Sequence, residues 1–150
     1  MGAEVHDSPN AWIAEHIRRF EETGGTPRPG VNDLLLTTRG RRSGELQRTA
    51  LVYAPDGDRY VLAASNRGAD RHPAWYLNLL AEPLVTVQVG RETFTARART
   101  TTAEECPHLW ELMVSQRPEY GGYQQQTARE IPVVILERAH ELADEDSDAV

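Results

Sequence analysis

The sequence of 150 residues contains no lysine, only one cysteine and no long apolar run. A single cysteine, Cys106, excludes an intrachain disulfide and a metal site built from several cysteines. The five histidines are scattered, with no two at the spacing of helical metal ligands, so the sequence predicts no metal site. No apolar run approaches the roughly 20 residues of a membrane-spanning helix, and residues 1–10 lack the basic and apolar regions of a signal peptide. We therefore expect a cytoplasmic protein.

The charge is unevenly distributed along the chain. The net charge is −7, and it would be −2 without the five carboxylates of residues 141–150. An acidic chain disfavours nucleic-acid binding. Residues 39–48 nevertheless carry four arginines against Glu45 alone. Because every basic residue is arginine, any anion site here uses planar, bidentate guanidinium groups.

Apolar periodicity predicts a small α+β domain that is mostly β with flanking helices. Strands are expected at residues 34–38, 49–54, 59–65, 84–89, 92–100 and 131–136. Helices are expected at residues 10–22, at 73–81 and from Thr102, in a capping box with Glu105, to before Pro118. A tight turn at residues 55–58 is expected to join the second and third strands as a hairpin. Such a pattern is typical of a small, mostly antiparallel barrel.

Composition divides the chain into three parts. Residues 1–9 are expected to be a disordered N-terminus, residues 10–140 a single domain and residues 141–150 a disordered acidic tail. The helix at residues 10–22 has an apolar face, but its polar face mixes Glu15, Glu21 and Glu22 with arginines. It is therefore not the basic type that binds anionic lipid. Packing on the domain or on a partner subunit is favoured over peripheral membrane association, which stays open as an alternative.

The first of three unusual stretches is the basic turn at residues 38–44, TRGRRSG. Glycines allow backbone N–H groups to face an anion, and Arg41, Arg42 and Ser43 would add side-chain donors. Such a turn binds a phosphate or a carboxylate. It lacks the glycine spacing of a Walker loop. A solvated hairpin turn is the alternative.

The other two stretches are aromatic. Residues 70–78 place Trp75 and Tyr76 at the start of a helix, where core packing is the alternative. Residues 117–124 place Tyr120 and Tyr123 around a glycine pair. A flexible aromatic loop of that kind could close over a flat ligand, and an ordinary surface loop is the alternative.

Together, the runs LLLTTRGRRSG, AASNRGADRHPAWYLNL and PEYGGYQQQTAREIPVVIL resemble the three signature regions of the deazaflavin (coenzyme F420)-dependent nitroreductase family, which includes F420H2-dependent quinone reductases. The resemblance extends over about residues 10–138, with the runs in the same order and spacing. It implies a split β-barrel of the flavin-reductase type and coenzyme F420 as cofactor. The implied activity is hydride transfer from reduced F420 to a quinone, a nitroaromatic or an activated enone. A deazaflavin carries its own hydride chemistry, so the protein need only bind, orient and protonate.

The resemblance also implies a set of site residues. The coenzyme's phosphate and anionic tail would contact Arg41, Arg42, Ser43 and Arg48. The deazaflavin would contact Ser65, Asn66, Arg67, Gly68, Trp75 and Tyr76. The substrate pocket would contain Tyr120, Tyr123 and Arg117. Tyr120 is the first candidate for the catalytic proton donor and Ser65 the second.

Two other functions and one assembly remain open. An FMN-dependent reductase on the same barrel would also need a phosphate-binding turn. A non-catalytic F420-binding module would bind the coenzyme without turnover. The partner we expect is a planar electron acceptor. A homodimer stays open as an assembly, since split barrels of this size often pair.

Overall fold

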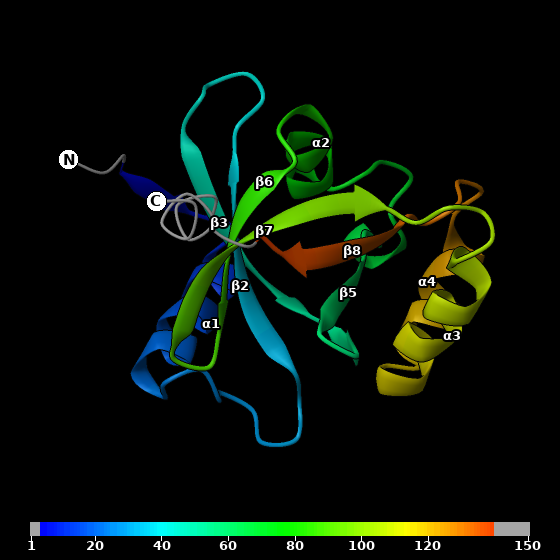
Figure 1. The fold of residues 1–150 in the computed structure, drawn as a ribbon, viewed down its shortest axis with the longest axis horizontal. Helices are drawn as coiled ribbons and strands as arrows, with labels where there is room; N and C mark the ends of the chain where they lie inside the picture. Colours follow the sequence, from blue (N-terminus) through cyan, green and yellow to red (C-terminus); the bar gives the residue numbers. More distant parts are fainter. Residues whose placement is uncertain (1–3, 140–150) are drawn as a thin grey trace, which may run out of the picture.

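A computed structural model describes residues 4–139, and a single eight-stranded sheet forms its centre (Figure 1). The strands are β1 (Val5–Asp7), β2 (Asp33–Arg39), β3 (Leu46–Val52), β4 (Ala54–Asp56), β5 (Arg59–Ala63), β6 (Leu84–Val89), β7 (Glu92–Thr100) and β8 (Val133–Arg138). The helices are α1 (Ala11–Glu22), α2 (Ala74–Ala81), α3 (Cys106–Gln116) and α4 (Glu119–Gln126), with a 3-10 turn η1 (Asn66–Gly68). The predicted α+β class is confirmed.

The strand order is β1-β3-β2-β6-β7-β8-β5-β4, and only the β1–β3 pairing is parallel. β1 and β4 therefore lie at the two ends of the order, and no strand pairing within residues 4–139 closes the sheet into a barrel. The expectation of a barrel is thus confirmed only in part: the sheet is mostly antiparallel and flanked by helices, but it is not closed within the described residues. None of the described helices is long and apolar enough to cross a membrane.

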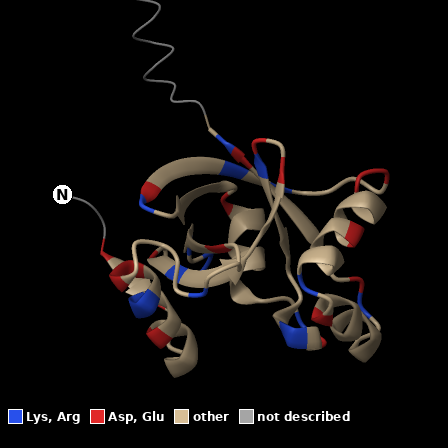
Figure 2. Ribbon diagram, turned by 90° about the horizontal axis from the view of Figure 1, so that it is seen from below, with Lys and Arg blue, Asp and Glu red and all other residues tan. Residues whose placement is uncertain are grey.

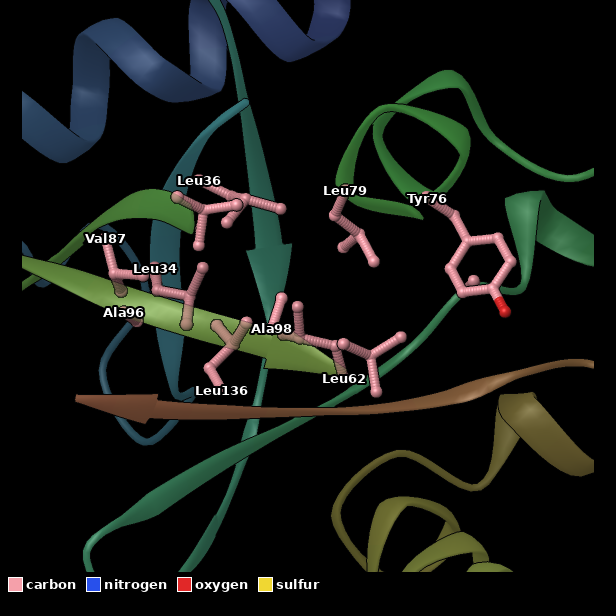
Figure 3. Packing of buried hydrophobic residues seen from close by; sticks show 12 residues of the cluster. Leu34, Leu36, Leu62, Tyr76, Leu79, Val87, Ala96, Ala98 and Leu136 are labelled. Carbon is pink, nitrogen blue, oxygen red and sulfur yellow. The ribbon is translucent and has the colours of Figure 1, made fainter. Parts of the chain in front are cut away.

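The central strand β2 is buried on both faces, which explains its uninterrupted leucine run. Leu34 and Leu36 point into the main core with Leu62, Leu136 and residues of α2 (Figure 3). Leu35 points to the opposite face and packs against Ile17 and Phe20 of α1. A strand covered on both faces has no polar side to alternate with its apolar one.

Helix α1 has a local cap at its start and a close contact with the domain just after its end. The Asn10 side-chain oxygen caps its start by accepting hydrogen bonds from the N–H groups of Trp12 and Ile13, at 3.0 and 3.1 Å. Its end passes into Gly25 (φ 97°), where a Cβ would lie only 2.3 Å from the Cα of Gly90. Acidic and basic residues are interspersed along the helix (Figure 2). Because its apolar residues Ile17 and Phe20 are fully buried in the domain, packing on the domain is the alternative that the structure supports.

Three local predictions are wrong. The predicted second strand divides at Tyr53: β3 pairs with β2, and only the short β4 forms the hairpin with β5. The residues predicted as a flexible loop at 117–124 instead lie largely in helix α4, which Pro118 precedes and which packs against η1 and α3. Residues 5–7, within the predicted disordered N-terminus, form β1 on the edge of β3. In each case a contact distant in sequence overrides the local pattern. The predicted acidic tail at 141–150 lies outside the described residues.

The predicted capping box at the start of α3 is present and includes a third partner. The Thr102 N–H donates to Glu105 Oε1 at 2.8 Å, and the Glu105 N–H donates to Thr102 Oγ1 at 3.2 Å. The Arg99 guanidinium also binds both Glu105 oxygens, at 2.8 and 2.9 Å. The hydrogen bonds from Arg99 and then from the Thr102 backbone lower the pKa of Glu105 from 4.5 to about 2.

This arrangement predicts an acid-sensitive contribution to stability. A carboxylate whose pKa is lowered by folding stabilises the protein above its unfolded pKa, and this contribution is lost as pH falls through the folded pKa. We therefore expect Glu105→Gln to reduce the dependence of unfolding free energy on pH between about 4.5 and 2, as measured by urea titration. Glu104→Gln, at an exposed carboxylate with no ion pair in residues 4–139, is the control. Equal pH dependence in the Glu105 variant and the wild type would contradict the assignment.

Candidate functional site

A cavity of about 180 Å³ lies between α1, η1 and α4, and we call it the α1–α4 cavity. Its lining residues are Trp12, His16, Arg28, Asp33, Ala50, Leu51, Val52, Ser65, Arg67, Arg117, Glu119, Tyr120 and Tyr123. Five of these were predicted from the sequence as site residues: Ser65, Arg67, Arg117, Tyr120 and Tyr123. The cavity is smaller than the roughly 300–1,000 Å³ of drug-sized ligand pockets, so it suits the reacting ring of a ligand rather than a whole coenzyme.

The basic turn between β2 and β3 is a separate part of the site. Its Arg41, Arg42 and Ser43 are all exposed and do not line the α1–α4 cavity. Neither arginine makes an ion pair with any residue of the described range 4–139. In an acidic chain where seven other arginines are paired with carboxylates, these two guanidinium groups remain available to an external anion.

Arg48 differs from the other residues predicted to bind the coenzyme's anionic groups. Its Nε lies 2.7 Å from Asp7 and its Nη1 lies 3.0 Å from Glu21. These partners, Asp7 first, raise the pKa of Arg48. The structure therefore places Arg48 in an ion-pair cluster that joins β1, β3 and α1, apart from Arg41 and Arg42.

Asn78 of α2 holds the basic turn in place, and sequence reasoning missed it. Its Nδ2 donates to Thr38 Oγ1 and to Gln47 Oε1, both at 3.1 Å, and its Oδ1 accepts from the Arg41 N–H at 3.1 Å. A buried amide needs such partners, because an unpaired polar group in the interior is costly. The signal available in the sequence was one polar residue inside the apolar run AWYLNLLA.

The segment that follows Ser65 has an unusual backbone. Asn66, Arg67 and Gly68 have successive positive φ angles of 47, 56 and 80°. Positive φ is unfavourable for residues other than glycine, at about 1–3 kcal/mol each. Glycine is needed at position 68 for space as well, since a Cβ there would lie 3.0 Å from the carbonyl oxygen of Tyr123 in α4. The second and third signature stretches therefore meet at Gly68.

Arg129 binds this strained segment from the other side, and it was also missed. Its guanidinium donates to the carbonyl oxygens of Ser65 and Ala69, each at 2.8 Å, and of Ala64 at 3.3 Å. Its Nη1 lies 3.0 Å from His72 Nδ1. Arginine carries only donors, so His72 accepts at Nδ1 and keeps its proton on Nε2. Burial, followed by the charge of Arg129, lowers the pKa of His72 and favours this neutral form.

A further group that sequence reasoning missed lies on the α1 side of the cavity. His16 is buried, and its Nε2 lies 3.3 Å from Asp33 Oδ1, while Arg28 Nε donates to Asp33 Oδ2 at 3.2 Å. Trp12 stacks on the His16 ring with centroids 5.9 Å apart, and the Arg67 guanidinium lies 5.1 Å from the Trp12 ring centre. The sequence indicated only a packing helix, although His16 falls on its apolar face.

The aromatic residues predicted from the sequence have different environments. Tyr120 is half-buried in the cavity wall, with Trp110 and Tyr123 ring centres 6.4 and 5.9 Å away. Burial is the main cause that raises the pKa of Tyr120 to about 12. Tyr76 is instead a core residue whose hydroxyl lies 2.8 Å from Thr100 Oγ1, and Trp75 packs at the edge of the same core.

The remaining predicted residues have partners of their own. Arg117 Nε donates to Glu119 Oε2 at 2.8 Å at the cavity wall. Asn66 Nδ2 donates to the Arg71 carbonyl oxygen at 3.1 Å. Ser43 Oγ accepts from the Glu45 N–H at 3.1 Å within the turn. No cluster of three or more metal-ligating side chains occurs in the part of the chain that the structure describes.

The structure thus has two exposed arginines without carboxylate partners in residues 4–139 at one turn, and a separate cavity lined by tyrosines. These features fit the class of proteins that bind an anionic ligand together with a planar one. Sequence comparison identifies the family within this class. The model of the family described as F420H(2)-dependent quinone reductase matches residues 12–138. The chain belongs to this family.

Individual relatives agree with this assignment. An F420H(2)-dependent quinone reductase of Mycobacterium tuberculosis is 39% identical over 108 residues, which cover 70% of this chain and 72% of that protein. A solved structure described as an F420-H2 dependent reductase, FDR-A, is 33% identical, with a TM-score of 0.65 and coverage of 91% of this chain and 100% of that one. A second solved structure, described as a domain-swapped dimer, is 37% identical with a TM-score of 0.68, and 87% of this chain covers all of it.

Proposed function

We propose that this oxidoreductase reduces a quinone with F420H2, with the coenzyme's anionic part at the basic turn and the acceptor in the α1–α4 cavity. Membership of the F420H(2)-dependent quinone reductase family supports F420H2 as the hydride donor and a quinone as the acceptor. Reduced F420, when bound, supplies the hydride. Nitroaromatics and activated enones are further acceptors that we propose, because a small aromatic cavity accepts many planar molecules.

The proposed coenzyme site uses two guanidinium groups that have no carboxylate partner in residues 4–139. Arg41 and Arg42 would bind the phosphate and the anionic tail with charge-assisted hydrogen bonds, and Ser43 would add a hydroxyl. Asn78 keeps the turn in position through the Arg41 N–H. The deazaflavin would lie along the segment Ser65–Gly68. Trp75 would contact the deazaflavin at most with the edge of its ring. Tyr76 already bonds Thr100, and Arg48 is paired with Asp7.

The proposed acceptor site uses the hydroxyls at the cavity wall. Hydride transfer to a quinone leaves negative charge on the acceptor oxygen, and a fixed donor stabilises that charge. Tyr120 and Ser65 are the donors that we propose, with Tyr123 and Arg117 shaping the pocket. The raised pKa of Tyr120 keeps its phenol protonated and able to donate at neutral pH.

We also propose that two chains assemble as a homodimer. In that dimer, the sheet of each chain would form the split β-barrel expected from the sequence. The 37% identical relative described as a domain-swapped dimer supports this. Leu80 and Leu84 are large apolar residues exposed near the α2–β6 junction, and a second copy would cover them. Light scattering of the purified chain would test the proposal, and a monomer at micromolar concentration would contradict it.

A panel of acceptors tests the proposed activity. The purified chain would be mixed with F420H2 and a soluble quinone, a nitroaromatic or an enone, and oxidation followed at the coenzyme's absorbance band. Oxidation that depends on both protein and quinone is the expected result. Oxidation with reduced FMN but not with F420H2 would favour the flavin alternative. Saturable F420 binding without turnover of any acceptor would favour the non-catalytic binding module.

A further inference from the structure

We propose that His16, oriented by Asp33, delivers the proton that the reduced acceptor takes up in the α1–α4 cavity. This inference rests on the proposed function, since it assigns a residue to the same site. It brings helix α1 into the chemistry, whereas the three signature stretches all lie beyond residue 30. His16 thereby joins Tyr120 and Ser65, whose hydroxyls stabilise the acceptor oxygen.

The position of His16 is the first observation. Its ring lines the same cavity as Ser65 and Tyr120, and it is the only histidine among the cavity residues. Asp33, whose side chain is 1% exposed, lies 3.3 Å from His16 Nε2 at the first residue of β2. A carboxylate in this position fixes the orientation of an imidazole and stabilises its protonated form.

The second observation concerns the other ring nitrogen. Nδ1 of His16 makes no hydrogen bond to any residue of the described range, although the side chain as a whole is buried. No fully buried side-chain nitrogen or oxygen in that range is left without a partner. Nδ1 must therefore be accessible, and the cavity is the space that the ring lines. With Nε2 directed at Asp33, a protonated ring presents Nδ1–H to a ligand.

The charged and titratable groups around His16 come from every neighbouring element. Asp33 lies on β2 and is shared with Arg28, so its charge is not directed at the imidazole alone. Arg67 of η1 lies over Trp12, which stacks on the His16 ring. The groups facing the cavity from the α4 side are Arg117, Glu119, Tyr120 and Tyr123. Histidine is also the side chain that most often serves as general acid or base in enzymes.

In the proposed step the acceptor receives a hydride from the coenzyme and a proton from His16. The acceptor gains two electrons and one hydrogen from the reduced coenzyme, which is oxidised. The Nδ1–H bond of the His16 imidazolium breaks, and the proton forms an O–H bond with the acceptor oxygen. His16 is left neutral beside Asp33 and takes its next proton from solvent. Tyr120 donates a hydrogen bond to the same oxygen and keeps its own proton, as expected from a phenol whose pKa is raised to about 12.

The kinetic test compares His16→Gln with the wild type. The single-turnover rate of F420H2 oxidation by a 1,4-naphthoquinone would be measured from pH 5 to 9. Because the protonated ring is the active form, the wild-type rate should fall as pH rises through the titration of one group. In His16→Gln the rate should be about 10²-fold lower at low pH and should lack that limb, with an unchanged F420 dissociation constant. Asp33→Asn should shift the limb, and His108→Gln, at an exposed histidine of α3, should behave as wild type.

A second readout needs no coenzyme and no turnover. The ¹⁵N resonances of the histidines would be followed in the coenzyme-free wild type during a pH titration, with and without 1,4-dihydroxynaphthalene as the bound product analogue. The signals absent from His16→Gln identify His16. We expect its Nδ1 to titrate and to shift when the analogue binds, while Nε2 stays protonated.

The outcomes separate this inference from the proposed function. A wild type that oxidises no F420H2 would contradict the function, and the NMR titration would still decide the state of His16. An unchanged pH limb in a folded His16→Gln would overturn the proton assignment while leaving the function intact. A His16 Nδ1 that neither titrates nor responds to the analogue would overturn it as well. A purely structural role, fastening α1 to β2, would lower the melting temperature of His16→Gln without moving the pH limb.

Discussion

Replacing both Arg41 and Arg42 with alanine is expected to weaken F420 binding by about 10²- to 10⁴-fold. Each guanidinium is free of carboxylate partners in residues 4–139 and would make charge-assisted hydrogen bonds to the coenzyme. Such a bond is worth about 1.5–3 kcal/mol, and each 1.4 kcal/mol corresponds to a tenfold change in affinity. Asn78 still binds the backbone N–H of residue 41 after the substitution, so the turn should keep its shape.

Fluorescence titration of F420 would measure the dissociation constants. The matched control is the double variant Arg19→Ala/Arg97→Ala, which removes the same charge from two exposed arginines away from the turn. Added salt should weaken F420 binding to the wild type more than binding to the Arg41/Arg42 variant. Salt screens the attraction between the two guanidinium groups and the anionic coenzyme, and the variant lacks that attraction. Identical titration curves for the wild type and this variant would remove the basic turn from the coenzyme site.

Much of the fold could be predicted because its signals are local. The leucine run of β2, the alternation of β6 and β7 and the capping box at Thr102 each depend on neighbouring residues. Whether the sheet closes does not depend on neighbouring residues, and neither does the division of the second predicted strand at Tyr53. Before Tyr53 the chain pairs with β2, as β3, and after Tyr53 it pairs with β5, as β4. No pattern within residues 49–54 specifies which strand lies beside them.

The sequence predicted individual residues of the candidate site but not how they are arranged in space. The stretches that resemble the family contained Ser65, Arg67 and Tyr120, which the structure places around one cavity. Local reasoning also favoured a flexible loop for the glycine pair beside Tyr120. That segment is a helix because α4 packs on η1, where Gly68 allows the close approach to the Tyr123 carbonyl. Propensity is a weak guide where tertiary packing decides.

The residues that were missed act through distant partners. Arg129 binds carbonyl oxygens about 60 positions earlier in the chain. His16 meets Asp33 across the interface between α1 and β2. An arginine or a histidine has no sequence neighbour that indicates such a role, and only the assembled backbone brings the partner within hydrogen-bonding distance. These residues hold or complete a site whose recognisable motifs lie elsewhere.

Tyr120→Phe is expected to lower kcat and kcat/KM together by about 10²-fold. The phenol is the one polar group of a half-buried ring in the cavity wall, and a donor fixed beside a developing oxyanion contributes about that factor. An interaction made only in the transition state lowers both parameters equally. F420 affinity should hardly change, since Tyr120 lies apart from the basic turn. Ser65→Ala should produce a smaller loss of the same kind, because Ser65 is the second proposed donor.

Steady-state kinetics with a soluble quinone separates the outcomes for Tyr120. Loss of packing alone would raise KM and leave kcat unchanged. Tyr60→Phe is the matched control, because it removes a phenol that packs with Tyr53 and Phe94 outside the cavity lining. The phenol and the imidazole are also distinguishable: Tyr120→Phe should reduce the rate at every pH and keep the acidic limb that we assign to His16. Wild-type kcat in both Tyr120→Phe and Ser65→Ala would exclude the two hydroxyls from the chemistry, and the cavity would then serve only to position the acceptor.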